Sequence, residues 1–296
     1  MTSLSRKDWV LLILLTLCWG INWPIMKIAV QNFPPIAFRT LCIAGAIPVL
    51  WAAARMQRTS LKISRDDLGT IFTLAIPNLM IWNIFMIVGV KMLSSGRAAI
   101  LGYTMPVWAI LSGLIFFRDR ISRLGWCGIG FALSGALLLL SSEFATLAGQ
   151  PMGSVVMLVA AAAWGYGTVL MKRTQIKIPT ITLTFWMLVL TAICMAVVSG
   201  LVEYRYWRLP TSSETAAIAY NAIMIFGFGQ VTWFTLARKL PPLASSLSVM
   251  MIPVLGVFSG AWILHETPHW QDYVAMLLIL AAMGTVLLKP RADAAK

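Results

Sequence analysis

Charged residues are scarce in this sequence. Asp, Glu, Lys and Arg together make up 11% of the chain, whereas 59% of its residues are hydrophobic and the mean hydropathy is +0.84. Soluble domains carry about 25% charged and about 45–50% apolar residues. The composition therefore excludes a water-soluble fold. Because the apolar residues come in runs of bilayer length, it indicates an integral membrane protein.

Residues that bind metals or act as nucleophiles are also few. The chain has two histidines and four cysteines, and no two cysteines have the C-x-x-C spacing. The cysteines, all within apolar runs, are Cys18, Cys42, Cys127 and Cys194. Cysteines in such surroundings are typical packing residues and predict neither disulfides nor metal ligands.

One segment resembles a zinc-protease motif. His265-Glu266-Thr267-Pro268-His269 matches H-E-x-x-H, which binds zinc when both histidines lie on one helical face. Pro268 disfavours the helical conformation at Thr267, so the match does not predict a metal site. Every carboxylate of the sequence also lies outside the apolar runs or at their ends. We therefore expect no enzyme activity, no metal and no cofactor.

Ten apolar runs follow one another along the chain. They cover residues 9–30, 35–54, 68–90, 94–117, 121–142, 152–171, 179–202, 215–238, 241–264 and 270–288. The predicted fold class is all-α integral membrane with ten transmembrane helices. With the N-terminus in the cytoplasm, 17 Lys and Arg residues fall on the cytoplasmic side and at most six on the other. Because short cytoplasmic loops are enriched in Lys and Arg, both termini are predicted to be cytoplasmic.

The two halves of the sequence repeat one another. Trp19-Gly20 recurs 145 residues later as Trp164-Gly165, and Pro106 recurs 147 residues later as Pro253. Further pairs at a spacing of 147 are Leu93 with Leu240, Ser112-Gly113 with Ser259-Gly260, and Asp119 with Glu266. Each repeat contains five spans, an odd number, so the second copy must cross the membrane in the opposite direction. We predict two inverted five-helix domains, residues 1–147 and 148–296.

These duplicated features resemble the drug/metabolite transporter superfamily, specifically its ten-helix exporters of the EamA type, over essentially the whole chain. They are the Trp-Gly pair early in each half, the mid-span Pro106 and Pro253, and the acidic residue before a fifth helix rich in glycine and alanine. The density of aromatic and amide residues is most similar to the bacterial aromatic amino-acid exporters. A departure is Asp119, where the family usually has a glutamate. The resemblance implies export of aromatic and other neutral amino acids across the bacterial inner membrane.

Polar and aromatic side chains inside the spans are the candidates for a transport path, because polar groups in lipid are costly. Amides can donate and accept hydrogen bonds, so they can hold the ammonium and carboxylate of a zwitterion. Aromatic rings suit an apolar side chain and can contact an ammonium. The predicted substrate-binding residues are Trp19, Asn22, Asn78, Trp82, Asn83, Tyr103, Trp164, Gln230 and Trp233. For each residue the alternative is ordinary packing or interhelical hydrogen bonding.

Two prolines and three basic residues inside or near spans complete the set. Pro106 and Pro253 remove a backbone hydrogen bond in mid-span, so they are predicted gating hinges, with a static kink as the alternative. Arg39, at the start of its span, is expected to extend toward the membrane surface. Lys27 and Lys172 are expected either to do the same or to form charged rims that attract a carboxylate.

The predicted function is alternating-access export of amino acids and similar small metabolites. The spans hold no carboxylate or histidine for proton coupling, which favours facilitated diffusion or exchange. The alternatives are a multidrug or nucleotide-sugar carrier and, less well supported, a channel. The net charge of +13 comes from short basic clusters between spans, so no nucleic-acid partner is expected. The expected partners are a small-molecule substrate and membrane lipid, and the chain is expected to be a monomer.

Overall fold

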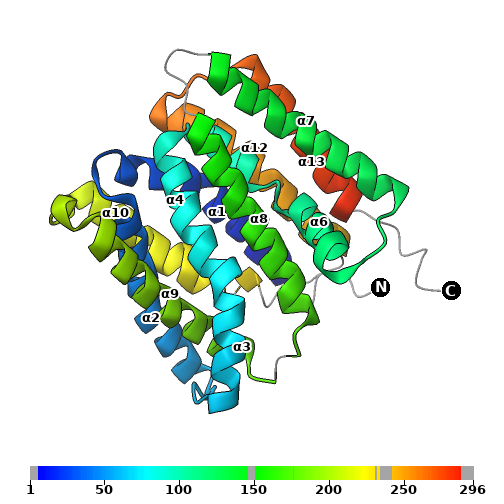
Figure 1. Ribbon diagram of the computed structural model, residues 1–296. Coiled ribbons are helices and arrows are strands. Elements are labelled where there is room, and N and C mark those ends of the chain that lie inside the picture. Colours follow the sequence, from blue (N-terminus) through cyan, green and yellow to red (C-terminus); the bar gives the residue numbers. More distant parts are fainter. Residues whose placement is uncertain (1–5, 146–150, 176, 231, 234–241, 288–296) are drawn as a thin grey trace.

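The chain folds into helices joined by short loops (Figure 1). The computed structural model describes residues 6–145, 151–175, 177–230, 232–233 and 242–287. Within these ranges there is no strand. Seven helical stretches are long and apolar enough to cross a membrane, and Met250–Leu264 is a shorter apolar helix. The protein is an all-helical integral membrane protein.

The helices follow the predicted spans closely. The first half contains α1 (Arg6–Asn32), α2 (Pro35–Met56), α3 (Arg65–Ala75), η1 (Ile76–Ile81), α4 (Trp82–Met92), α5 (Ser95–Gly102), α6 (Met105–Phe117) and α7 (Arg123–Ala145). The second half contains α8 (Pro151–Arg173), α9 (Thr180–Val202), η2 (Tyr204–Tyr206), α10 (Ser212–Tyr220), η3 (Asn221–Gly229), α12 (Pro242–Leu264) and α13 (Trp270–Leu287). Residues 231, 234–238, 241 and 288, which belong to the predicted spans eight, nine and ten, lie outside the described residues.

Two spans contain π-helical segments at equivalent places in the two halves. η1 continues α3 into α4, and η3 continues α10. π-helical turns are rare and are frequently found at functional sites. A third span is interrupted instead, since α5 ends at Gly102 and α6 begins at Met105. All three irregular spans reach the interior pocket described below, together with α1, α2 and α8.

Matching capping boxes start α3 and α10. The Ser64 hydroxyl accepts a hydrogen bond from the Asp67 amide, and the Asp67 carboxylate accepts one from the Ser64 amide. Thr211 and Glu214, 147 residues further along, form the same reciprocal pair. Each box satisfies two amide groups that the first turn of a helix leaves free. The repeat therefore extends to the starts of the third helical stretch in each half.

The helices of one half pack mainly against those of the other. α1 packs against α12 and α8 against α6, while α2 packs against α9 and α7 against α13. Figure 1 shows α7 and α13 side by side at one edge of the molecule. If the two halves are exchanged, the pair α1–α12 becomes the pair α8–α6. The pairs α2–α9 and α7–α13 each become themselves. The packing therefore has the twofold pattern of the repeated sequence.

The glycine of each Trp-Gly pair lies at one of these crossings. A Cβ on Gly165 would lie 2.7 Å from the Trp108 Cβ on α6 and equally close to backbone atoms there. A Cβ on Gly20 would lie 2.9 Å from the Leu255 Cδ1 on α12. Trp108 and Leu255 are themselves 147 residues apart. Small residues let membrane helices approach closely, which explains why this glycine is repeated.

The turns after α6 and α12 are also equivalent. Arg118 and His265 both have left-handed backbone conformations, with φ of 58° and 54°. The next residue in each turn, Asp119 or Glu266, donates its amide hydrogen to the carbonyl of Gly113 or Gly260. Such left-handed turns are a common way to end a helix. The turn directs a carboxylate back toward the bundle in both halves.

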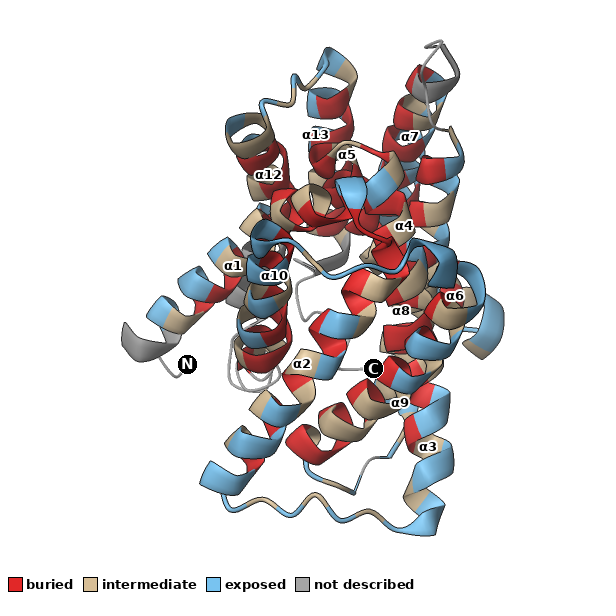
Figure 2. Cartoon of the chain, turned by 90° about the vertical axis from the view of Figure 1, so that its left-hand side faces the viewer, coloured by how far each residue is buried: buried red, intermediate tan, exposed pale blue. Residues whose placement is uncertain are grey.

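Burial separates the inner and outer faces of the helices (Figure 2). Buried residues lie on the faces with which the helices meet, and exposed residues line the outer sides of α2 and α3. Many exposed residues are large and apolar, among them Ile115 and Trp262. A continuous apolar exterior is unfavourable in water and suits contact with lipid. Trp9, Trp51 and Trp270 lie exposed near helix ends, as expected for residues at the membrane interface.

Candidate functional site

A pocket lies inside the bundle and is formed by both halves of the chain. Its empty volume is about 540 Å³, part of it open to solvent. The lining comes from α1, α2, η1, α4, the break between α5 and α6, α8 and η3. The lining residues are Trp19, Asn22, Trp23, Met26, Arg39, Leu79, Trp82, Asn83, Met86, Tyr103, Trp164, Ile225, Phe226 and Gln230.

Most of the residues proposed from the sequence meet in this pocket. Those that line it are Trp19, Asn22, Trp82, Asn83, Tyr103, Trp164 and Gln230. Asn78 and Trp233 do not. Asn78 donates to the Leu74 carbonyl over 2.9 Å and packs against Gly167 of α8. Trp233 stacks behind the lining, with its ring 5.9 Å from that of Trp19.

Aromatic rings form two walls of the pocket. Trp82 of α4 and Trp164 of α8 meet edge to face at a centroid distance of 4.3 Å and an angle of 81°. Trp23 of α1 and Tyr103 form a second edge-to-face pair at 6.3 Å. Edge-to-face pairs hold each other in fixed orientations. The pocket therefore presents rigid apolar surfaces to any molecule that enters it.

Glycines make room for one of these rings. A Cβ on Gly102 would lie 3.0 Å from the Trp23 ring, and a Cβ on Gly256 would lie 3.3 Å from it. A Cβ on Gly256 would also lie 2.6 Å from the Ala99 Cβ of α5. Gly256 thus allows α12 to approach α5 closely, as its place in a G-x-x-x-G pattern predicts.

Arg39 is the charged residue of the described lining, and sequence reasoning missed it. It was expected to extend to the membrane surface, but it is only 4% exposed and lines the pocket. Its Nε donates to Asn83 Oδ1 and its Nη1 to Asn221 Oδ1, both over 2.7 Å. Its Cζ lies 4.6 Å from the centre of the Phe226 ring. The expectation was wrong because these neutral partners hold the guanidinium inside the bundle.

The orientation of the two asparagines follows from their helices. Asn83 Nδ2 donates to the Leu79 carbonyl over 2.7 Å, and Asn221 Nδ2 donates to the Ala217 carbonyl over 3.0 Å. In each case the acceptor lies four residues earlier. Each amide oxygen is therefore left to accept from Arg39. The sequence did contain a signal for this buried contact, because Arg39 lies inside an apolar run and Asn83 and Asn221 lie in two other spans.

Two polar atoms in the lining have no hydrogen-bond partner among the described residues. They are the indole Nε1 of Trp19 and the amide Oδ1 of Asn22, and both are buried. Buried polar groups are nearly always paired, because an unpaired one costs about 1–3 kcal/mol. The residues that line the pocket therefore hold one donor and one acceptor whose hydrogen-bonding capacity is unused.

The two predicted hinges lie in different helical settings. Pro106 occupies the first turn of α6, directly after the break at Tyr103 and Thr104. Pro253 lies within α12, which continues through it. Proline is well tolerated in a first turn, where its missing amide hydrogen has no helical partner. Whether either proline acts as a hinge stays a prediction.

Lys27 has a structural role that neither sequence alternative anticipated. Its Nζ donates to the carbonyls of Lys91 and Leu93 over 2.8 and 2.7 Å. These carbonyls belong to the end of α4, where the helix leaves acceptors unpaired and carries partial negative charge. Lys27 therefore ties α1 to the end of α4. Its counterpart Lys172 is exposed.

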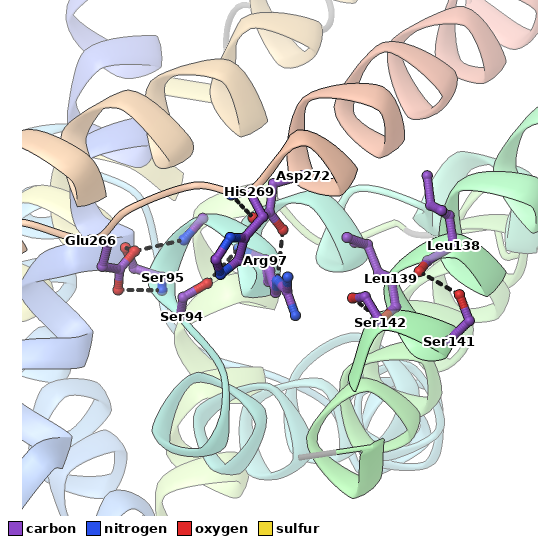
Figure 3. A network of polar contacts seen from close by, with 11 residues as sticks. Ser94, Ser95, Arg97, Leu138, Leu139, Ser141, Ser142, Glu266, His269 and Asp272 are labelled. Carbon is purple, nitrogen blue, oxygen red and sulfur yellow. Dashed lines mark hydrogen bonds and ion pairs between the residues drawn. The ribbon is translucent and has the colours of Figure 1, made fainter. Parts of the chain in front are cut away.

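The H-E-x-x-H segment forms a helix-capping loop (Figure 3). Glu266 points at the start of α5, where it accepts from the amide and hydroxyl of Ser95 over 2.7 and 2.8 Å. Arg97 of α5 pairs with Asp272 of α13 over 2.6 Å. Among the described residues no three His, Cys, Asp or Glu side chains gather as a metal site. The segment therefore joins the two halves on one side of the bundle.

The same side contains a second carboxylate cap. Glu203, at the end of α9, accepts from the amides of Ile36 and Ala37 over 3.1 and 2.8 Å. A carboxylate is favoured at a helix N-terminus by the free amides and by the helix dipole. Both caps come from the second half and act on helices of the first. On this side the two halves are held together by charged hydrogen bonds.

A membrane-embedded helical bundle that encloses a pocket of aromatic rings, amides and one guanidinium has the architecture of a membrane transporter. The model of the EamA-like transporter family matches the chain twice, over residues 8–141 and 151–288. The chain belongs to the EamA-like transporter family. Its family is one of transporters.

Individual proteins are similar over nearly the whole chain. The uncharacterized transporter YoaV of Bacillus subtilis is 26% identical, covering 90% of this chain and 92% of its own length. A probable amino-acid metabolite efflux pump of Salmonella typhimurium is 24% identical, covering 95% of this chain and 94% of its own. A solved structure entitled "Crystal structure of protein" covers 97% of this chain with a TM-score of 0.69 at 20% identity. That likeness supports the fold.

Proposed function

We propose that this protein exports aromatic and other neutral amino acids, and similar small metabolites, across the bacterial inner membrane by alternating access. The observation that carries the proposal is the interior pocket, which combines rigid aromatic walls with amide groups. Amides suit the charged groups of a zwitterion and aromatic walls suit its side chain. The name of the Salmonella typhimurium relative, a probable amino-acid metabolite efflux pump, supports amino-acid efflux as the process.

We further propose ten transmembrane helices as two inverted repeats, residues 1–147 and 148–296, with both termini in the cytoplasm. The double family match, the paired π-helices and the exchangeable packing partners support the repeat. The excess of Lys and Arg on one side supports the orientation. In a variant without native cysteines, a cysteine at Lys177 should be labelled only after cell permeabilisation, and one at Arg205 in intact cells. The reverse labelling would contradict this orientation.

Transport is proposed to be facilitated diffusion or exchange. No carboxylate or histidine lines the described pocket, and such a group usually serves as the coupling site of a proton-driven carrier. Flux in proteoliposomes should therefore follow the substrate gradient and respond little to an imposed pH gradient. A steep response to the pH gradient would contradict this mode.

Arg39 gives limited support to the alternative of a nucleotide-sugar carrier. A phosphate group attracts basic residues, and Arg39 is a cation in the pocket lining. It is, however, the only cation among the described lining residues, whereas a diphosphate carries at least two negative charges. Saturable and stereoselective flux of amino acids would favour the proposed carrier over both this alternative and a channel.

The test is uptake of radiolabelled amino acids into proteoliposomes. Wild-type protein should show saturable flux that favours tryptophan or phenylalanine. Trp164→Ala should reduce that flux about tenfold or more, because a pocket-lining aromatic residue is lost. Trp262→Ala is the matched control, since Trp262 is 81% exposed on the outer surface. An absence of amino-acid flux above protein-free vesicles would overturn the proposed substrate class.

A further inference from the structure

We propose that Arg39 binds the carboxylate of the transported molecule, so that the pocket selects carboxylates over their amides and decarboxylated amines. The inference rests on the proposed function only in taking the pocket as the transport site. It concerns the chemistry that the pocket requires and not the identity of the side chain. It applies to amino acids and to other monocarboxylates of similar size.

Arg39 is held inside the pocket by neutral groups. The acceptors are the amide oxygens of Asn83 and Asn221, each 2.7 Å from a guanidinium nitrogen, and the Met26 sulfur lies 3.6 Å from Nη1. The Phe226 ring covers the guanidinium at 4.6 Å. These contacts fix the direction of the side chain but supply no full negative charge.

The charge of Arg39 has no carboxylate partner in the described part of the chain. The ion pairs there are Arg97 with Asp272, Arg173 with Asp119 and Arg208 with Glu214. A buried cation without an anion is unfavourable, and buried arginines are usually paired with carboxylates. An anionic group is therefore the chemical complement of this pocket.

Donors remain on Arg39 for such an anion. The guanidinium carries five N–H donors. The contacts with Asn83, Asn221 and Met26 engage Nε and Nη1, and Nη2 donates to no described residue. The two N–H groups of Nη2 are thus left for a carboxylate, and hydrogen bonds between a guanidinium and a carboxylate are strong. A carboxylate oxygen can thus accept from Nη2 without displacing either asparagine.

A second unpaired atom completes an amino-acid site. Asn22 lines the same pocket, and its Oδ1 is buried without a hydrogen-bond partner among the described residues. An amide oxygen accepts hydrogen bonds and so suits an ammonium group. The two groups together match a zwitterion, with Arg39 for its carboxylate and Asn22 for its ammonium. A ligand without the ammonium loses only a hydrogen bond to the neutral Asn22 oxygen. A ligand without the carboxylate leaves the buried charge of Arg39 unpaired.

The loss of the carboxylate should therefore weaken binding more than the loss of the ammonium. Hydrogen bonds to charged groups are stronger than those between neutral groups, and sites built around a polar group reject analogues that lack it. We expect the wild-type protein to prefer a carboxylate over the matching amide by about 10- to 100-fold.

The experiment compares four indole probes by thermal stabilisation of the purified full-length protein in detergent. The probes are L-tryptophan, indole-3-propionate, L-tryptophanamide and tryptamine. The first two should bind to the wild type, and the last two should bind at least about tenfold more weakly. Arg39→Gln should remove this preference, and Arg39→Lys should retain part of it. Arg205→Gln, at an exposed arginine, is the matched control and should retain all of it.

Each outcome decides between the two proposals. Equal binding of tryptophan, its amide and tryptamine to the wild type would overturn the role of Arg39. Transport of amino acids together with that result would leave the proposed function intact. Binding of indole-3-propionate without amino-acid binding or transport would retain the role of Arg39 and overturn amino-acid export. Binding of none of the probes would overturn both. If both Arg39 variants fail to fold, the preference of the wild type still decides.

Discussion

The turns after α6 and α12 have the same backbone and different surroundings. In both, a left-handed residue is followed by a carboxylate whose amide bonds to a helix glycine six residues earlier. Asp119 is exposed and pairs with Arg173, which is also exposed. Glu266 instead meets the free amides at the start of α5. The comparison teaches that the repeated turn fixes only the direction of the carboxylate. The group that the carboxylate meets, an exposed arginine or buried helix amides, determines how firmly the contact joins the two halves.

The largest difference between the turns should appear when a methyl group is added beneath each carboxylate. A Cβ on Gly260 would lie 2.6 Å from Glu266 Oε2, and a Cβ on Gly113 would lie 2.6 Å from Asp119 Oδ2. Glu266 is held by α5, so Gly260→Ala should lower the free energy of unfolding by about 2–3 kcal/mol. Asp119 can move into water, and alanine stabilises a helix more than glycine does. Gly113→Ala should therefore change the free energy of unfolding by less than about 1 kcal/mol.

Chemical unfolding in a fixed detergent measures both variants. The double variant Gly113→Ala/Gly260→Ala should behave as the sum of the two, because the glycines lie in separate turns. Equal destabilisation by the two single changes would show that Asp119 is held as firmly as Glu266.

A smaller difference should follow from neutralising the carboxylates. Glu266→Gln replaces one acceptor oxygen by a donor that faces the Ser95 and Gly96 amides. The free energy of unfolding should fall by about 1–2 kcal/mol. Asp119→Asn breaks an exposed ion pair and should cost at most about 1 kcal/mol, less at high salt. If Asp119→Asn lowered the free energy of unfolding more than Glu266→Gln does, the turn after α6 would be the one that holds the halves more firmly.

The smallest effects concern the two capping boxes and pH. Arg208 hydrogen-bonds to Glu214 and, with Thr211, lowers the pKa of the Glu214 carboxyl below its usual value. Because the pKa is lower in the folded protein, this stabilisation is complete above the usual pKa and is lost as pH falls through the lowered one. Asp67, in the equivalent box, is exposed and has no ion pair among the described residues.

Glu214→Gln should therefore flatten the acid side of the stability curve more than Asp67→Asn does. Unfolding midpoints between pH 3 and pH 7 provide the measurement, with Arg208→Gln as a second variant that removes the same partner. Identical acid sensitivity in wild type and Glu214→Gln would show that this box contributes nothing to the pH dependence.

The sequence predicted the helices well, since they depend on residue type alone. Apolar runs between basic clusters marked α1, α2 and α9 almost to their ends, and the spacing of 147 residues linked the turns at Asp119 and Glu266. Seven of the nine candidate residues line the pocket for a similar reason. Polar or aromatic side chains in a membrane span tend to face the interior.

What the sequence did not predict depends on three-dimensional neighbours. A span has apolar residues on both its lipid-facing and its packed side, so periodicity did not separate Asn83 in the pocket from Asn78 against Gly167. Arg39 was assigned to the surface because its partners Asn83 and Asn221 lie far away in the chain. The π-helices and the break before α6 escaped prediction because hydropathy does not record how a helix is wound.

The helix caps across the two halves also set an order of events during synthesis. Glu203 is made 167 residues after Ile36, and Glu266 is made 171 residues after Ser95. At about 5–20 residues per second, each cap reaches its helix roughly 8–35 s after that helix leaves the ribosome. Until then the amides of Ile36, Ala37, Ser95 and Gly96 lack these carboxylate acceptors. The start of α5 therefore receives its carboxylate only after the ribosome has made most of the second half.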